Sequence, residues 1–196
     1  MVTTGIVLFD DAEELDFAGP WEVFTVARQE GDRVVTVAER AEPVRAANGL
    51  RVLADHSFTD CPELDVILVP GGQGTRREVD NPVLRSWLAD RAPRATWITS
   101  VCTGSLVLWG AGLVQDRRVT THWAFVETLR EKDGVTVVDD ERWVVDGNLV
   151  TSAGVSAGID MSLWLVGQLY GEDHARQVQL VMEYDPAPPW PMLRPA

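Results

Sequence analysis

The chain has 196 residues, of which 45% are hydrophobic and 24% charged, a composition typical of one well-cored folded domain. We predict a single domain over residues 1–196. The 17 Lys and Arg against 30 Asp and Glu give a formal net charge of −13. This acidic balance excludes nucleic acid as a partner, because binding to phosphates draws on clustered cations. No run approaches the ~18 apolar residues that span a bilayer, so no membrane association is expected.

The first segment, MVTTGIVLFDDAEELD, reaches acidic side chains before any long apolar core, so no signal peptide is predicted. Only two cysteines occur, Cys61 and Cys102. Both observations favour the cytoplasm, where thiols stay reduced, and a Cys61–Cys102 disulfide is the alternative. Cys61 precedes Pro62 in a polar loop without an activating neighbour, so we expect no chemical role for it.

Apolar runs and helical patterns alternate along the chain. Strands buried on both faces are predicted at 5–9, 34–38, 66–69, 96–99 and 149–151. Helices are predicted at about 19–30, 80–91, 103–111, 122–131, 156–170 and 172–182. This alternation predicts an α/β fold with a mostly parallel sheet between helices.

Two segments show tight-turn signals between short β runs. Asn48-Gly49 lies within 44–53, and Asp146-Gly147-Asn148 lies within 142–151, so both segments are predicted to be β-hairpins appended to the main sheet. The proline-rich tail, 185–196, is predicted to lie extended over the surface.

Polar residues and glycines follow four of the predicted strands. Asp16 lies in the turn after the first strand, Gly71 and Gly72 follow 66–69, Cys102 follows 96–99, and Gly154 follows 149–151. Ligands of open parallel sheets bind outside the carboxyl ends of the strands, where such loops converge. We therefore expect a site built around these residues.

Cys102 is the candidate nucleophile, because it stands between a buried strand and a helix. The positive end of a helix favours a thiolate, so we expect the pKa of Cys102 to be lowered. Gly104 allows close packing of the turn, as in the strand–nucleophile–helix elbow of hydrolases, and Thr103 offers a hydroxyl and an N–H group. The alternative is an inert buried cysteine.

Asp16 is the candidate proton donor and acceptor. Leu15 and Phe17 flank it, and desolvation beside a thiolate would raise its pKa, so that it stays protonated near neutrality. A turn or helix-cap role is equally compatible with its position. Gly71 and Gly72 either present N–H groups as an oxyanion hole or form a plain turn.

His122 opens an apolar helical pattern and is either a base or a satisfied structural residue. His56 and His174 lie in polar surroundings and are expected at the surface. Isolated cysteines and scattered histidines give no metal-ligand spacing, so neither a metal nor a cofactor is predicted. The run PGGQGT has the glycine spacing of neither a dinucleotide fingerprint nor a phosphate loop.

Six motifs together resemble the DJ-1/PfpI (ThiJ) superfamily, and most of all its isonitrile hydratases. They are LDFAGPWEVF (15–24), DVILVPGG (65–72), TSVCTGSLVL (99–108), AGLVQDRRVTTHWA (111–124), DGNLVTSAGVSAGID (146–160) and VQLVMEYDPAPPW (178–190). The resemblance implies a flavodoxin-like fold related to class I glutamine amidotransferases, a homodimer, and a small-molecule substrate. It also implies lyase chemistry, in which a Cys102 thioimidate converts isonitriles to N-formamides, with Asp16 handling protons, Thr103 assisting and Gly72 beside the thiol.

At two positions the sequence differs from other branches of this superfamily. The intracellular-protease branch carries histidine where this chain has Thr103, and the DJ-1 branch carries glutamate where it has Asp16. Peptidase and glyoxalase chemistry are therefore less favoured. The alternatives are a non-enzymatic ligand sensor, similar to the sensor domain of AraC-type regulators without their DNA-binding domain, and a redox sensor in which Cys102 is oxidised.

Overall fold

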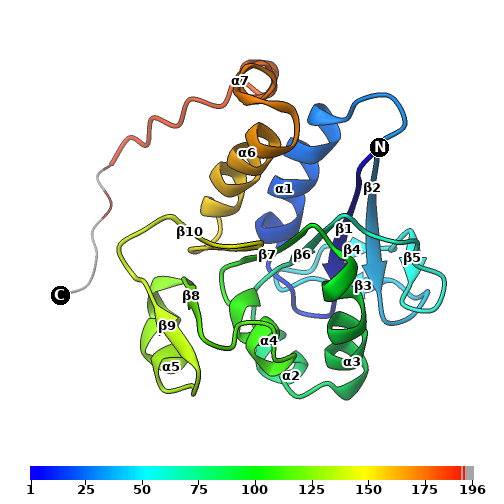
Figure 1. Cartoon of the computed structure of the whole chain (residues 1–196), viewed down its shortest axis with the longest axis vertical. Coiled ribbons are helices and arrows are strands. Elements are labelled where there is room, and N and C mark those ends of the chain that lie inside the picture. Colours follow the sequence, from blue (N-terminus) through cyan, green and yellow to red (C-terminus); the bar gives the residue numbers. More distant parts are fainter. Residues whose placement is uncertain (191, 193–196) are drawn as a thin grey trace.

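The computed structural model describes residues 1–190 and 192 of the chain (Figure 1). A seven-stranded sheet forms its centre, in the order β10-β11-β7-β6-β1-β2-β5. The strands are β1 (Thr3–Leu8), β2 (Arg33–Ala38), β5 (His56–Ser57), β6 (Val66–Val69), β7 (Trp97–Val101), β10 (Trp143–Asp146) and β11 (Leu149–Ser152). All neighbours pair in parallel except β10, which pairs antiparallel to β11 at one edge. The predicted flavodoxin-like α/β fold is confirmed.

Two layers of helices cover the sheet (Figure 1). One layer packs α1 (Glu14–Ala27), α6 (Ala157–Tyr170) and α7 (Glu172–Val181) against one another. The other contains α2 (Thr75–Glu78), α3 (Pro82–Arg91) and α4 (Gly104–Gly110). Because both faces are covered, every residue of β1, β6 and β11 is buried, which explains the unbroken apolar run of β6.

The predicted hairpins differ in where they attach. The pair β10–β11 joins the main sheet, as expected. The pair β3 (Val44–Arg45) and β4 (Arg51–Val52) instead forms a separate two-stranded sheet, so its predicted attachment to the main sheet is wrong. A second small sheet, parallel β8 (Arg117–Val119) and β9 (Val135–Val137), was not predicted, because three-residue strands carry too little apolar pattern.

The first helix begins earlier than predicted. It starts at Glu14 and includes Pro20, so Asp16 lies in its first turn and not in a preceding loop. Acidic side chains in the first turn interact favourably with the helix dipole. The predicted helix at 122–131 is divided into a 3₁₀ turn, η2 (Trp123–Phe125), and α5 (Val126–Arg130). A second 3₁₀ turn, η1 (Ala92–Arg94), follows α3.

The C-terminal tail follows α7. Residues 185–190 are exposed and lie outside helices and strands, as predicted for the tail. The remainder of that prediction, at 191 and 193–196, lies outside the described residues. Within the described part of the chain, no helix is long and apolar enough to cross a membrane.

Candidate active site

Register brings the predicted strand ends together at one edge of the sheet. Strand β7 lies between β6 and β11, with Ser100 opposite Val69 on one side and Thr151 on the other. The start of α1 reaches the same edge, because Ala12 forms an isolated bridge with Gly72. The loops after β6, β7 and β11 therefore surround one point.

Cys102 occupies that point in a left-handed backbone conformation. Its φ is +56°, an unfavourable value for a residue with a side chain. The Cys102 N–H donates to Ser152 O at 3.1 Å, and Cys102 O accepts from Thr121 Oγ1 at 3.0 Å. These bonds hold the residue at the elbow between β7 and α4, with only 6% of its surface exposed. Both Cys102 and Cys61 are free thiols, so the disulfide alternative does not occur.

Asp16 is completely buried beside Cys102. Its Oδ2 accepts a hydrogen bond from the Gly71 N–H at 2.9 Å, while Oδ1 has no partner among the described residues. Burial raises the pKa of Asp16 to about 7, the charge of Glu13 adds to the rise, and hydrogen bonds from Gly71 and Cys102 oppose it. The carboxyl is therefore close to half protonated at neutral pH, in agreement with the predicted direction.

The predicted low pKa of Cys102 is wrong for this structure. Burial raises the pKa of its thiol to about 12, and the charge of Asp16 adds to the rise. Hydrogen bonds from Thr103 and from the Val155 N–H oppose it. Desolvation is the largest cause of the shift, although α4 begins only two residues later, at Gly104. Near neutral pH the Cys102 thiol is therefore protonated, while Asp16 exchanges between its protonated and charged forms.

The two N–H groups after β6 bind the protein itself. The Gly71 N–H donates to Asp16, and the Gly72 N–H donates to Thr103 Oγ1 at 3.1 Å. Thr103 Oγ1 also lies 3.0 Å from Thr75 Oγ1. The structure therefore does not support an oxyanion hole made of these two N–H groups. They position the carboxyl and the hydroxyl instead.

Gly71 lies against the side chains of both Cys102 and Asp16. A Cβ at Gly71 would lie 2.7 Å from Cys102 Cβ and 2.8 Å from Asp16 Oδ2. We expect Gly71→Ala to displace both groups and to lower kcat/KM by about 100-fold. In the control Gly167→Ala the added Cβ meets only an ordinary contact at 3.8 Å, to Ala175, so activity should persist. Full activity of Gly71→Ala in a steady-state assay would contradict this arrangement.

A further residue of the site, Val155, was missed from the sequence. Its φ is +46°, strained for a β-branched residue, and its N–H donates toward the Cys102 sulfur. In this loop, the sequence marked only the neighbouring Gly154 as a candidate site residue. Gly154 itself makes room for His122, because a Cβ there would lie 2.2 Å from His122 Cδ2.

His122 acts as a cap at the start of η2. Its Nδ1 accepts a hydrogen bond from the Ala124 N–H at 3.2 Å, so Nε2 carries the proton when the ring is neutral. Burial, and then the charge of Arg76, lower the pKa of His122. The structural alternative for His122 therefore agrees with this geometry better than the role of a base does.

Arg76 is a second residue that the sequence did not single out. Its Nη1 donates to Gly72 O at 2.6 Å, and its guanidinium lies 3.9 Å from the centre of the Phe125 ring. It thus places a positive charge at the rim of the Cys102 site. No sequence signal marks it, because it lies in an ordinary polar run.

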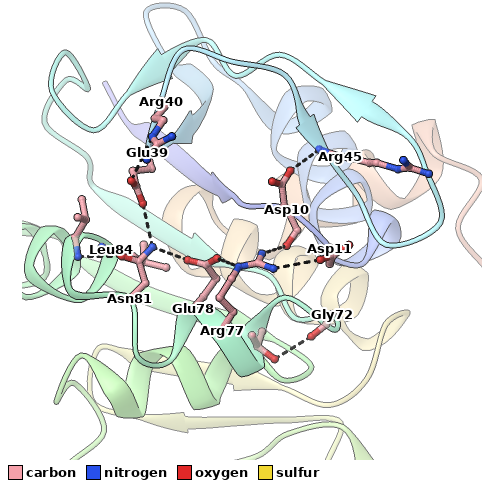
Figure 2. A network of polar contacts seen from close by, with 12 residues as sticks. Asp10, Asp11, Glu39, Arg40, Arg45, Gly72, Arg77, Glu78, Asn81 and Leu84 are labelled. Carbon is pink, nitrogen blue, oxygen red and sulfur yellow. Dashed lines mark hydrogen bonds and ion pairs between the residues drawn. The ribbon is translucent and has the colours of Figure 1, made fainter.

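A cavity of about 560 Å³ lies apart from Cys102. Polar residues on its wall form the network in Figure 2, in which Asn81 donates to both Glu39 and Glu78, and Arg77 contacts Glu78 and Asp10 O. None of the predicted site residues lines this cavity. The described residues contain no group of three or more His, Cys, Asp or Glu that could hold a metal ion.

Burial of Asp16 makes the stability of the protein depend on pH. Because its folded pKa of about 7 exceeds the ordinary 3.8, this stabilisation is complete below about pH 4 and is lost as the pH rises through 7. The loss amounts to at most about 4 kcal/mol. We expect Asp16→Asn to gain stability relative to the wild type between pH 5 and pH 8 in urea denaturation. If the difference in the free energy of unfolding between Asp16→Asn and the wild type is the same at pH 5 and pH 8, this expectation is contradicted.

The fold and the site together define an α/β protein with a thiol at a strand–helix elbow and a buried carboxyl beside it. A family model described as "DJ-1/PfpI family" matches residues 3–168. The chain belongs to the DJ-1/PfpI family. This assignment confirms the resemblance that the sequence motifs indicated.

Three relatives illustrate the range of similar proteins. The isonitrile hydratase of Pseudomonas putida is 43% identical over 186 residues, covering 95% of this chain and 80% of that protein. A crystal structure of a ThiJ/PfpI family protein from Pseudomonas syringae has a TM-score of 0.91 and 34% identity, covering 96% of this chain and 77% of that chain. The HTH-type transcriptional regulator CdhR of Pseudomonas aeruginosa is 35% identical over 136 residues, which are 69% of this chain and 40% of the regulator.

Proposed function

We propose that this protein is an isonitrile hydratase, a lyase that converts R–N≡C and water to the N-formamide R–NH–CHO. The observation that carries the proposal is the buried Cys102–Asp16 pair, which places a nucleophilic thiol beside a carboxyl whose pKa burial raises to about 7. Similarity to the Pseudomonas putida isonitrile hydratase supports the choice of substrate class. No cofactor takes part in the proposed reaction.

In the first step, Cys102 Sγ attacks the terminal carbon of the isonitrile. Asp16 accepts the thiol proton as the S–C bond forms and delivers it to the same carbon, giving the thioimidate Cys–S–CH=N–R. The raised pKa of Asp16, about 7, suits a group that must both accept and donate this proton. The site therefore does not need a preformed thiolate.

In the second step, water attacks the thioimidate carbon. Asp16 takes a proton from the water and passes it to the imine nitrogen, which gives the tetrahedral intermediate Cys–S–CH(OH)–NH–R. The C–S bond then breaks as the hydroxyl of the intermediate becomes the carbonyl, the hydroxyl proton passes through Asp16 to the sulfur, and R–NH–CHO leaves. Hydrogen bonds to sulfur from Thr103 and Val155 stabilise the thiolate as it departs.

Incubation with cyclohexyl isocyanide tests the proposal. We expect N-cyclohexylformamide to accumulate in proportion to time and enzyme, with no added metal or cofactor. The absence of formamide under conditions where the protein is folded would refute the hydratase.

We also propose a cytoplasmic homodimer. Leu15 and Leu50 are 40% and 50% exposed, and they lie on segments that the Asn48 to Glu14 hydrogen bonds join. Exposed apolar side chains on adjoining elements favour association. Light scattering coupled to size exclusion should give the mass of two chains, and a Leu50→Glu variant should shift it toward one.

A ligand or redox sensor is the second candidate, favoured by the similarity to the regulator CdhR. This role requires that the protein does not turn over isonitriles and that it forms a stable complex with a DNA-binding protein. A redox version requires selective peroxide oxidation of Cys102, seen by mass spectrometry, in a protein that does not turn over isonitriles.

A further inference from the structure

We propose that Arg76 binds an anionic group of the substrate, so that the preferred isonitriles carry a carboxylate. This inference rests on the proposed hydratase function and names the substrate class of the same site. It makes Arg76 a specificity-determining residue that contacts the substrate away from the reacting carbon.

Arg76 is held in place at the rim of the site. Its Nη1 donates to Gly72 O at 2.6 Å and lies 3.3 Å from Thr75 Oγ1, which in turn lies 3.0 Å from Thr103 Oγ1. The Phe125 ring supports the guanidinium from one face at 3.9 Å. The guanidinium is thus linked through the Thr75 hydroxyl to Thr103, the residue after Cys102. Because it is fixed on two sides, it is preorganised for a ligand.

Among the residues that the structure describes, no carboxylate pairs with Arg76. Across the described residues, its contacts are to a carbonyl, a hydroxyl and a ring. Its neighbour Arg77 contrasts with it, because Arg77 pairs with Asp11 and Glu78 in the network of Figure 2. Of these two consecutive arginines, one is paired within the protein and the other keeps donors free for a ligand.

Electrostatics makes such a cation necessary for an anionic substrate. The chain carries a formal net charge of −13, and Asp16 carries part of a negative charge near neutral pH. A carboxylate approaching this site is repelled unless a local cation offsets the field. Burial lowers the pKa of Arg76 and the charge of Cys102 opposes that effect, so the two groups lie within each other's field. The planar fork of arginine also matches a carboxylate in a bidentate bond.

Isocyanoacetate and its methyl ester provide a matched pair of substrates, because both keep the isonitrile and only one carries the charge. We expect the wild type to favour isocyanoacetate. Arg76→Gln should lower kcat/KM for isocyanoacetate about tenfold, through KM, and change that for the ester less than twofold. Arg76→Lys should recover part of the loss. The control Arg176→Gln, on α7, removes the same charge and should change neither.

Equal losses for both substrates would overturn the inference, because they would assign Arg76 a structural role. Unchanged kinetics in Arg76→Gln would overturn it as well. If the wild type hydrates neither compound nor cyclohexyl isocyanide, the proposed hydratase fails. Calorimetric titration of isocyanoacetate into Cys102→Ala then still decides whether Arg76 binds the anion. Adding Arg76→Gln to this variant should weaken or abolish the binding. Equal binding by the single and the double variant would refute the inference.

Discussion

Replacement of Cys102 by serine is expected to lower kcat/KM for cyclohexyl isocyanide by at least about 10³-fold. A serine hydroxyl is a far weaker nucleophile than the sulfur that it replaces. The substitution removes little volume, so the melting temperature should stay within a few degrees of the wild type. Steady-state formamide production and a thermal melt measure the two effects.

Cys61→Ser is the matched control for this variant. Cys61 is also a free, buried thiol, and burial raises its pKa to about 11, but its sulfur contacts Pro62 O and no group of the site. We expect wild-type kinetics from it. Comparable turnover by Cys102→Ser and the wild type would mean that sulfur does not form the covalent bond.

Asp16→Asn is expected to raise the reactivity of the Cys102 thiol and to lower the turnover of isonitriles. Loss of the Asp16 charge removes one cause of the raised pKa of Cys102, so the thiol pKa should fall and alkylation by iodoacetamide near pH 8 should become faster. Turnover should nevertheless drop by about 10²- to 10⁴-fold, because no group remains to move the proton from sulfur to carbon. Alkylation rates over a pH series and formamide assays measure both quantities.

Glu13→Gln is the control for this effect. Glu13 contributes only a lesser part of the raised pKa of Asp16, so its replacement should lower that pKa slightly and leave turnover near normal. If Asp16→Asn loses activity but its thiol reacts more slowly than in the wild type, the electrostatic coupling of the pair is contradicted.

Much of the site could be predicted because its scaffold has a strong sequence pattern. The unbroken apolar runs at 66–69 and 149–151 define buried parallel strands, and parallel strands end at one edge. The convergence of Asp16, Gly71 and Cys102 follows from that topology. The direction of the raised pKa of Asp16 was also predicted, since apolar neighbours in the sequence pointed to burial.

The remaining features depend on packing between distant segments. The pKa of Cys102 rises first because the thiol is buried, with 6% exposure, and then because α1 places Asp16 beside it, and neither fact is encoded near Cys102. The left-handed Val155 results from the chain path after β11, and valine gives no local signal for it. Arg76 becomes a candidate only when Phe125 and Gly72 are seen to hold it.

A crystal structure of the protein soaked with cyclohexyl isocyanide tests the central claim most directly. We predict continuous density from Cys102 Sγ to the terminal carbon, a planar C=N bond, and Asp16 within hydrogen-bond reach of the adduct. An isonitrile bound without a covalent bond in the separate cavity beside Glu78, with Cys102 unmodified, would contradict the assignment of Cys102 as the nucleophile.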